Sequence, residues 1–201
     1  MSAADSQILS VGPLAESEAK WTKLVKIQYK DPTGRTRDWG SAERSTCPKG
    51  SDIDGVGIVA ILAKSTGPEI VLQKQYRPPA DKIMIEVPAG LVDEGETAEE
   101  SAVRELIRGD RLWEESRPVM WNDPGFCSTN LRMIHVTIDM SDPANQKLKP
   151  ELEENELIEV FSVPLGFLWN ECKKLEAEGY AIDARVGTLA ECIELAKRFK
   201  I

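Results

Sequence analysis

The pattern of apolar and polar positions predicts a polar lead-in followed by a small β domain. Residues 1–19 read as a loose polar segment, and from Lys20 the pattern changes: the runs KWTKLVKIQY and RTRDWGSAERST flank the tetrapeptide DPTG. In that tetrapeptide Pro32 suits the second position of a type I turn and Gly34 the fourth. The pattern therefore predicts a hairpin or small antiparallel β-sheet within residues 20–52.

The pattern within residues 53–201 predicts a larger domain in which strands alternate with helices. The runs VGIVAIL, EIVLQKQY, IMIEV and LRMIHVTID are apolar or alternating and are bounded by Gly and Pro, as strands are. Two later runs, PLGFLWNECKKLEAEG and GTLAECIELAKRFK, place apolar residues at helical spacing. Gly179 offers a stop for the first helix, and Thr188 with Glu191 has the spacing of a capping box in the second. Together these elements predict an α/β fold with a mixed sheet and helices on both faces.

Composition and charge narrow the class of protein. The chain has 201 residues, of which 41% are hydrophobic and 29% charged, which fits one globular domain with a smaller appendage. Its formal net charge of -9 disfavours non-specific binding of nucleic acid. The first residues lack a basic segment followed by an apolar core, and no apolar run reaches the length of a membrane span. The sequence predicts no membrane association and a place in the cytosol, with the nucleus as the alternative.

A further helix, beginning near Ala98, is the best candidate for chemistry. Thr97 and Glu100 have capping-box spacing at its start. Along this helix Glu105 could present a carboxylate beside backbone carbonyls of the preceding loop, including that of Ala89. Carboxylate and carbonyl oxygens are the ligands that a hard cation such as magnesium prefers.

The spacing around this helix resembles a known family. Gly90, then five residues to Glu96, then seven to the pair Arg104 and Glu105, resembles the first part of the Nudix box. The segments KW, DPTG, QYRPP, EVPAGLVDEGET, NDPGF and DARV, in this order from Lys20 to Val186, more closely resemble the ADP-sugar pyrophosphatase branch of that family. Several separated matches in order are far more specific than a single motif.

The resemblance implies a fold and a reaction. The fold would be a Nudix-type α/β/α sandwich with a mixed sheet, preceded by a small N-terminal antiparallel β-sheet that exchanges across a homodimer and forms part of the nucleotide site. The reaction would be hydrolysis of the diphosphate of ADP-ribose, or of a related ADP-sugar, to AMP and a sugar phosphate. Magnesium, or alternatively manganese, would be the cofactor.

The resemblance also implies site residues. The metal site would comprise the carbonyl of Ala89, the carboxylate of Glu105 and the nearby Glu86. Glu156 is similar in position to a loop glutamate proposed as general base, and Glu105 and Arg104 complete the catalytic set. The residues implied in substrate binding are Trp21 and Trp39 around the adenine, Arg44 close to the same nucleotide site, Arg77 on phosphate, Leu91, and Asp123 near the terminal ribose.

The resemblance breaks after Leu106. The family pattern calls for glutamates at the positions of Arg108 and Gly109, which this chain lacks, and the closing glycine is also missing. Positions three and four beyond Glu105 share its helix face, so the change removes oxygen ligands from that face.

Three explanations of this break are open. The first is a misplaced exon boundary affecting residues 107–117, and the second is a true loss of catalysis. The third is recruitment of Asp110, or of the Glu114 and Glu115 pair, to the metal. The alternative function is therefore a catalytically impaired ADP-sugar-binding protein or a dimer partner of an active relative.

Structural roles compete with several of these assignments. Trp21 and Trp39 could pack against each other across the strands of the hairpin. Glu96 could hold the loop through Arg104 rather than take part in chemistry. Glu156 could belong to a solvated acidic loop.

Overall fold

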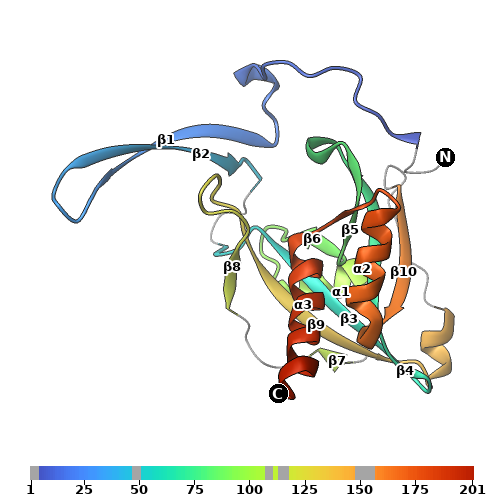
Figure 1. Cartoon of the computed structure of the whole chain (residues 1–201). Coiled ribbons are helices and arrows are strands. Elements are labelled where there is room, and N and C mark those ends of the chain that lie inside the picture. Colours follow the sequence, from blue (N-terminus) through green and yellow to red (C-terminus); the bar gives the residue numbers. More distant parts are fainter. Residues whose placement is uncertain (1–4, 47–50, 107–110, 113–117, 148–156) are drawn as a thin grey trace.

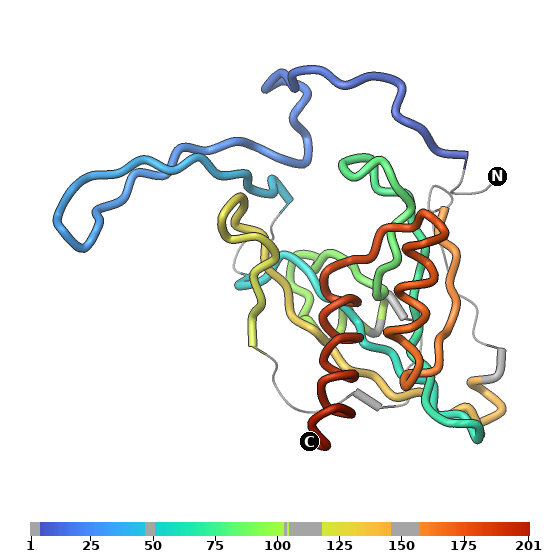
Figure 2. Tube along the Cα trace, viewed as in Figure 1, coloured from blue at the N-terminus to red at the C-terminus, as the bar shows by residue number. Residues whose placement is uncertain are grey.

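A hairpin and an α/β body make up the computed structural model of the chain (Figure 1). The structure describes residues 5–46, 51–106, 111–112, 118–147 and 157–201. Figure 2 shows the hairpin extending away from the body, while the lead-in crosses from the hairpin to the far side of the body. None of the helices in these ranges is both long and apolar enough to cross a membrane.

The predicted N-terminal hairpin is confirmed. Strands β1 (Thr22–Lys30) and β2 (Thr36–Arg44) pair in antiparallel register. The turn between them closes through a hydrogen bond in which the Gly34 amide donates to the Asp31 carbonyl at 2.9 Å. Gly34 has a φ of +84°, which glycine adopts without steric cost. The side chain of Asp31 also accepts from the Thr33 amide at 2.9 Å, so local turn chemistry fixes this hairpin.

The body contains a mixed sheet, as predicted. Its central strands run in the order β11-β5-β4-β3-β9-β7, with β10 paired to β4, β6 to β3 and β8 to β9. The β3–β9 and β11–β5 pairs are parallel and the other pairs are antiparallel. The strands are β3 (Gly55–Lys64), β4 (Gly67–Arg77), β5 (Lys82–Glu86), β6 (Ala89–Leu91), β7 (Arg111–Leu112), β8 (Val119–Trp121), β9 (Asn130–Asp139), β10 (Ile158–Pro164) and β11 (Ala181–Ile182).

Helices cover both faces of this sheet, which confirms the predicted α/β/α layers (Figure 1). Helix α1 (Ala98–Leu106) packs on one face, and α2 (Leu168–Ala177) and α3 (Ala184–Phe199) lie side by side on the other. Short segments of 3-10 helix lie at Glu16–Glu18, Pro78–Ala80, Pro143–Lys147 and Leu165–Phe167.

Strand β3 divides the core between the two faces. Its buried residues Val56 and Ile58 pack in the cluster on the α1 side, and Val59 packs in the cluster on the α2–α3 side. Successive residues of a strand point to opposite faces, so a nearly continuous apolar run is what a strand covered on both sides requires.

The predicted start of the last helix is wrong. Thr188 and Glu191 have capping-box spacing, but both lie inside α3, which begins at Ala184. Asp183 is the N-cap instead: it is extended, and its carboxylate accepts the Arg185 amide at 2.8 Å. Aspartate is a strong N-cap, and the helix that it caps already includes Thr188 in its interior. The predicted stop of the preceding helix is confirmed, because α2 ends at Ala177 and Gly179 has a φ of +98°.

Candidate active site

The candidate site includes the loop between β6 and α1. Helix α1 starts at Ala98, where the sequence predicts it. The Thr97 amide donates to the Glu100 carboxylate at 2.8 Å, and the Glu100 amide donates to the Thr97 hydroxyl at 3.1 Å. This reciprocal pair is a capping box and satisfies two amides that a helix start would otherwise leave open. Gly95, with a φ of +85°, turns the chain just before it.

Arg104 ties this loop to the helix. Its Nε lies 3.0 Å from Glu96 Oε1, and its Nη2 donates to the Leu91 carbonyl at 2.9 Å. The buried Ser101 donates its hydroxyl to the same carbonyl at 3.1 Å. The hydrogen bond from Arg104 lowers the pKa of Glu96, which keeps the pair ionised at neutral pH. Arg104 therefore positions the loop, as the structural alternative for Glu96 expected, and the catalytic role implied for it stays a prediction.

Arg77 and Glu86 form a second ion pair, on the face of the sheet that carries α1. Arg77 ends β4 and Glu86 ends β5. The Arg77 Nε lies 3.1 Å from both oxygens of Glu86, and its Nη2 lies 2.8 Å from Oε2. The Glu86 side chain is 6% exposed and that of Arg77 is 43% exposed. Three residues beyond Glu86, Ala89 pairs with Gly57 of β3, so the structure brings Arg77, Glu86 and Ala89 to one end of the sheet.

Asp183 and Arg185 brace the same end of the sheet from the α3 side. The Arg185 Nε and Nη2 donate to the two Asp183 oxygens at 2.8 and 2.9 Å, and the Asp183 amide donates to the Ile85 carbonyl at 3.0 Å. Burial raises the pKa of Asp183, but the hydrogen bond and charge of Arg185 outweigh it, so the pKa is lowered overall. A Cβ on Gly57 would lie 2.7 Å from Met133 Sδ and 3.7 Å from Arg185 Nη1, so β3 passes close to this pair.

No role was predicted for the Asp183–Arg185 pair, although the DARV segment that contains it is part of the family resemblance. The available signal was an aspartate at an N-cap followed two residues later by an arginine. That signal does not reveal the contact with β5, which joins residues far apart in the chain.

The structure does not bring Trp21 and Trp39 together. In the hairpin register Trp39 lies opposite Ile27, whereas the Trp21 carbonyl accepts the Ser45 amide at 3.0 Å. Six positions along β2 separate Ser45 from Trp39, which is about 20 Å of extended strand. The two indoles therefore neither stack on each other nor enclose a base within one chain. Both side chains are exposed.

Trp39 lies instead beside the loop that carries Asp123. Its indole Nε1 donates to the Gly125 carbonyl at 3.2 Å. Farther along β2, the Ala42 amide donates to the Phe126 carbonyl at 3.0 Å. These bonds fix the position of the hairpin relative to the Asp123 loop. Arg44 is exposed at the end of β2, opposite Thr22.

Several predicted residues fall outside the described part of the chain. These are Glu156, the altered box positions Arg108 and Gly109, the candidate substitutes Asp110, Glu114 and Glu115, and the side chain of Glu105, whose backbone lies in α1. Within the ranges that the structure does describe, no three His, Cys, Asp or Glu side chains gather closely enough to hold a metal ion. The described oxygen donors at the predicted metal site are thus the Ala89 carbonyl and Glu86, whose carboxylate is engaged by Arg77.

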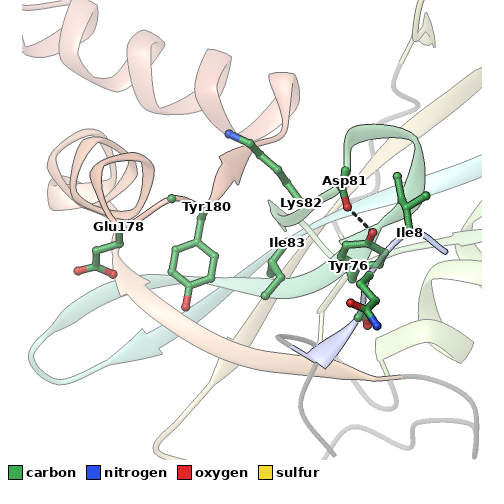
Figure 3. Close-up of a pocket in the computed structure, with 10 residues that line it drawn as sticks. Ile8, Tyr76, Asp81, Lys82, Ile83, Glu178 and Tyr180 are labelled. Atoms are coloured by element: carbon green, nitrogen blue, oxygen red, sulfur yellow. Dashed lines mark hydrogen bonds between the residues drawn. The ribbon is translucent and has the colours of Figure 1, made fainter. Parts of the chain in front are cut away.

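A separate hollow of about 550 Å³ lies beyond the β4–β5 turn (Figure 3). Ile8 of the lead-in, Tyr76 and Tyr180 line it, and the Tyr76 hydroxyl donates to Asp81 at 2.6 Å across its edge. Among the predicted site residues that the structure describes, none lines this hollow. Arg77, the next residue of β4, points to the opposite face of the sheet from Tyr76.

A protein-family model matches most of the α/β body. The model of the NUDIX domain matches residues 53–182, which is more than half of the chain. This chain belongs to the Nudix family. Nudix hydrolases generally depend on divalent metal ions.

Relatives of this Nudix chain confirm the resemblance to the ADP-sugar pyrophosphatase branch. It is 45% identical to an ADP-ribose pyrophosphatase of Saccharomyces cerevisiae, in an alignment covering 98% of this chain and 87% of that protein. It is 36% identical to an ADP-sugar pyrophosphatase of Mus musculus, over 85% of this chain and 80% of that protein.

A solved structure described as an ADP compounds hydrolase has a similar fold. Its TM-score is 0.59 at 16% sequence identity, and the match covers 94% of this chain and 92% of that chain. At this identity the similarity supports the fold alone.

Proposed function

We propose that this Nudix protein hydrolyses the diphosphate of ADP-ribose, or of a related ADP-sugar, to AMP and a sugar phosphate. The observation that carries the proposal is the extent of the match to the ADP-ribose pyrophosphatase of Saccharomyces cerevisiae. It covers 98% of this chain, so it includes the N-terminal hairpin as well as the catalytic domain. The hairpin holds Trp21, Trp39 and Arg44, which the sequence analysis connects with the nucleotide.

Arg77 is the proposed diphosphate ligand. Its guanidinium is held at the end of the sheet by Glu86 and is still 43% exposed. A planar guanidinium can donate two parallel hydrogen bonds to phosphate oxygens and carries a fixed positive charge. Leu91, whose side chain is partly exposed, and Asp123 would line the sugar side of the site.

The proposed cation site includes the Ala89 carbonyl and the Glu105 carboxylate, with magnesium as the ion and manganese as the alternative. Carbonyl and carboxylate oxygens are the donors that such hard cations take. When bound, the cation would neutralise the diphosphate and activate a water for attack. Glu156 is the proposed base that accepts the proton of that water.

We further propose that the active unit is a homodimer. Trp21 and Trp39 of one chain are about 20 Å apart along the hairpin, so a base held between them needs one tryptophan from each of two chains. The hairpin also exposes Leu24 and Ile27, which a second copy could bury. Trp39 and Asp123 would then belong to the same chain at each site, because the Asp123 loop hydrogen-bonds Trp39.

The second candidate function is binding of an ADP-sugar without turnover. It is favoured by Arg108 and Gly109, which stand where the box has its pair of glutamates. Binding requires the aromatic and phosphate contacts, whereas fast hydrolysis also requires the full set of metal ligands.

One experiment separates the two functions. The purified chain is mixed with ADP-ribose, the magnesium concentration is raised, and AMP release is measured beside the Glu105→Gln variant. Metal-dependent AMP that disappears in the variant supports hydrolysis through this box. Nucleotide binding without AMP supports the binding function. In that case, recovery of turnover on restoring glutamates at Arg108 and Gly109 would assign the defect to the box.

A further inference from the structure

We propose that Glu86 is a positioning residue, which holds Arg77 for the substrate diphosphate, and not a metal ligand. The inference rests on the proposed function for the role of Arg77. It differs from the expectation drawn from the sequence, which placed Glu86 at the metals. Three features of the described residues support it: the geometry of the pair, the reach of the arginine, and the burial of the carboxylate.

The geometry uses both oxygens of Glu86. Arg77 Nε lies 3.1 Å from Oε1 and from Oε2, and Nη2 lies 2.8 Å from Oε2. This leaves the Nη1 edge of the guanidinium to bind a phosphate oxygen. Such charged, forked pairs fix the orientation of the guanidinium plane as well as its position.

The register shows that Glu86 draws the guanidinium along the sheet. Arg77 is paired with Lys82, whereas Glu86 is paired with Gln73, four residues farther along β5. The two Cα atoms are therefore about 13 Å apart along the β4–β5 pair, and the two side chains together span that distance. An arginine at the rim of a sheet would otherwise be free to point into solvent. Glu86 directs its guanidinium toward the end of β5, three residues before Ala89.

Burial makes Glu86 dependent on this partner. Its side chain is 6% exposed, so water solvates the carboxylate poorly, and a buried carboxylate requires a partner of opposite charge. Arg77 provides that charge. Its positive charge at the same time offsets the attraction of the Glu86 carboxylate for a metal cation. A divalent cation on the same oxygens would lie next to the guanidinium, and the two positive charges would repel each other.

The backbone around Glu86 is also held in place. The Asp183 amide donates to the carbonyl of Ile85, the residue before Glu86, and Arg185 fixes Asp183 through two hydrogen bonds. A carboxylate on a braced strand end can impose its geometry on a flexible arginine. The braced strand therefore fixes the position of Glu86, and Glu86 in turn fixes the guanidinium of Arg77.

The test compares Glu86→Gln, Arg77→Lys and the double variant with the wild type. Binding of ADP-ribose and of inorganic pyrophosphate is measured by calorimetry in the presence of a metal chelator. Binding of Mn²⁺ without nucleotide is measured separately by electron paramagnetic resonance. The matched control is Glu69→Gln, because Glu69 lies on β4, the strand of Arg77, and pairs with Lys64 at 2.6 Å, away from the site. Thermal unfolding verifies that each variant is folded.

If Glu86 positions Arg77, Glu86→Gln weakens metal-free ligand binding by about tenfold. Arg77→Lys weakens it similarly, because lysine cannot form the fork, and the double variant is no weaker than the single ones. Mn²⁺ binding is the same in wild type and Glu86→Gln, and Glu69→Gln changes neither quantity. Weakened Mn²⁺ binding with unchanged metal-free ligand binding would overturn the proposal and make Glu86 a metal ligand. A wild-type chain that binds pyrophosphate but not ADP-ribose would overturn the proposed function, while the pyrophosphate data would still test the Arg77–Glu86 relationship.

Discussion

The Arg104 guanidinium pairs with the Glu96 carboxylate across the loop that leads into α1, with Nε 3.0 Å from Oε1 and Nη2 3.0 Å from Oε2. Because Nη2 also donates to the Leu91 carbonyl, one side chain joins the strand before the loop, the loop itself and the helix after it. The Asp93 amide completes the arrangement by donating to Glu96 Oε2 at 3.0 Å. Arg104 thus controls the shape of the loop next to the predicted metal site.

Replacing Arg104 with glutamine should loosen this loop. The hydrogen bonds through Glu96 close the loop, so their loss should raise hydrogen exchange at the Asp93 amide by about tenfold, while exchange in α2 and α3 stays unchanged. Hydrogen–deuterium exchange measures this directly. Lys174→Gln, which removes an exposed ion pair with Glu171 in α2, is the control. Normal loop exchange combined with lost AMP release would instead support the catalytic role implied for Arg104.

Thr97→Ala should destabilise the protein by about 1 kcal/mol, because it removes the hydroxyl that caps α1. Urea unfolding at neutral pH measures the free energy of unfolding. Thr188→Ala is a matched control, because Thr188 lies inside α3 and Asp183 is the cap there. Its effect should be smaller than that of Thr97→Ala, and equal effects would contradict the assignment of the two caps.

These two threonines also show what the sequence can predict. The hairpin turn and the start of α1 depend on residues within four positions of one another, so their signals are visible in the sequence. Thr188 carries the same local signal as Thr97 and misleads, because Asp183 caps the helix five residues earlier. A local pattern identifies possible caps but does not choose between two of them.

The Arg77–Glu86 and Asp183–Arg185 ion pairs depend on the fold and were not predicted, unlike the Glu96–Arg104 pair, which the sequence indicated. Arg77 and Glu86 were assigned to different partners, phosphate and metal, and their contact follows from the pairing register of β4 with β5. The contact of Asp183 with Ile85 joins residues almost a hundred positions apart. The separation of Trp21 from Trp39 likewise follows from the register, which the sequence does not specify.

Asp183→Asn should reduce stability in a way that depends on pH. The folded protein lowers the pKa of Asp183 from the ordinary value of 3.8, so its pairing with Arg185 stabilises the fold above that pH and the stabilisation is lost as the pH falls below it. At neutral pH the free energy of unfolding of the variant should be about 1–3 kcal/mol lower than that of the wild type. This difference should shrink as the pH falls below the ordinary pKa of an aspartate. Urea unfolding over this pH range measures it. A difference that is constant with pH would show that the charge of Asp183 contributes nothing.

Mixing two tryptophan variants should restore nucleotide binding if the base is held between Trp21 of one chain and Trp39 of the other. Trp21→Ala and Trp39→Ala homodimers should each bind ADP-ribose weakly, because every site lacks one indole. In a mixed dimer one site combines both substitutions and the other combines both intact tryptophans. After denaturation and joint refolding of equal amounts, random pairing in a two-fold dimer should restore about a quarter of the wild-type sites. Calorimetry counts those sites.

The Trp21→Ala, Trp39→Ala double variant mixed with wild type is the control for this experiment. In that mixed dimer each site keeps one indole, so only the wild-type homodimers contribute complete sites, again about a quarter of the total. The double variant refolded with either single variant should restore none. If mixing the two single variants restores no sites, the indoles act within one chain or do not bind the base. The distance of about 20 Å along the hairpin excludes joint action within one chain, so the second explanation would hold and the adenine assignment would be wrong.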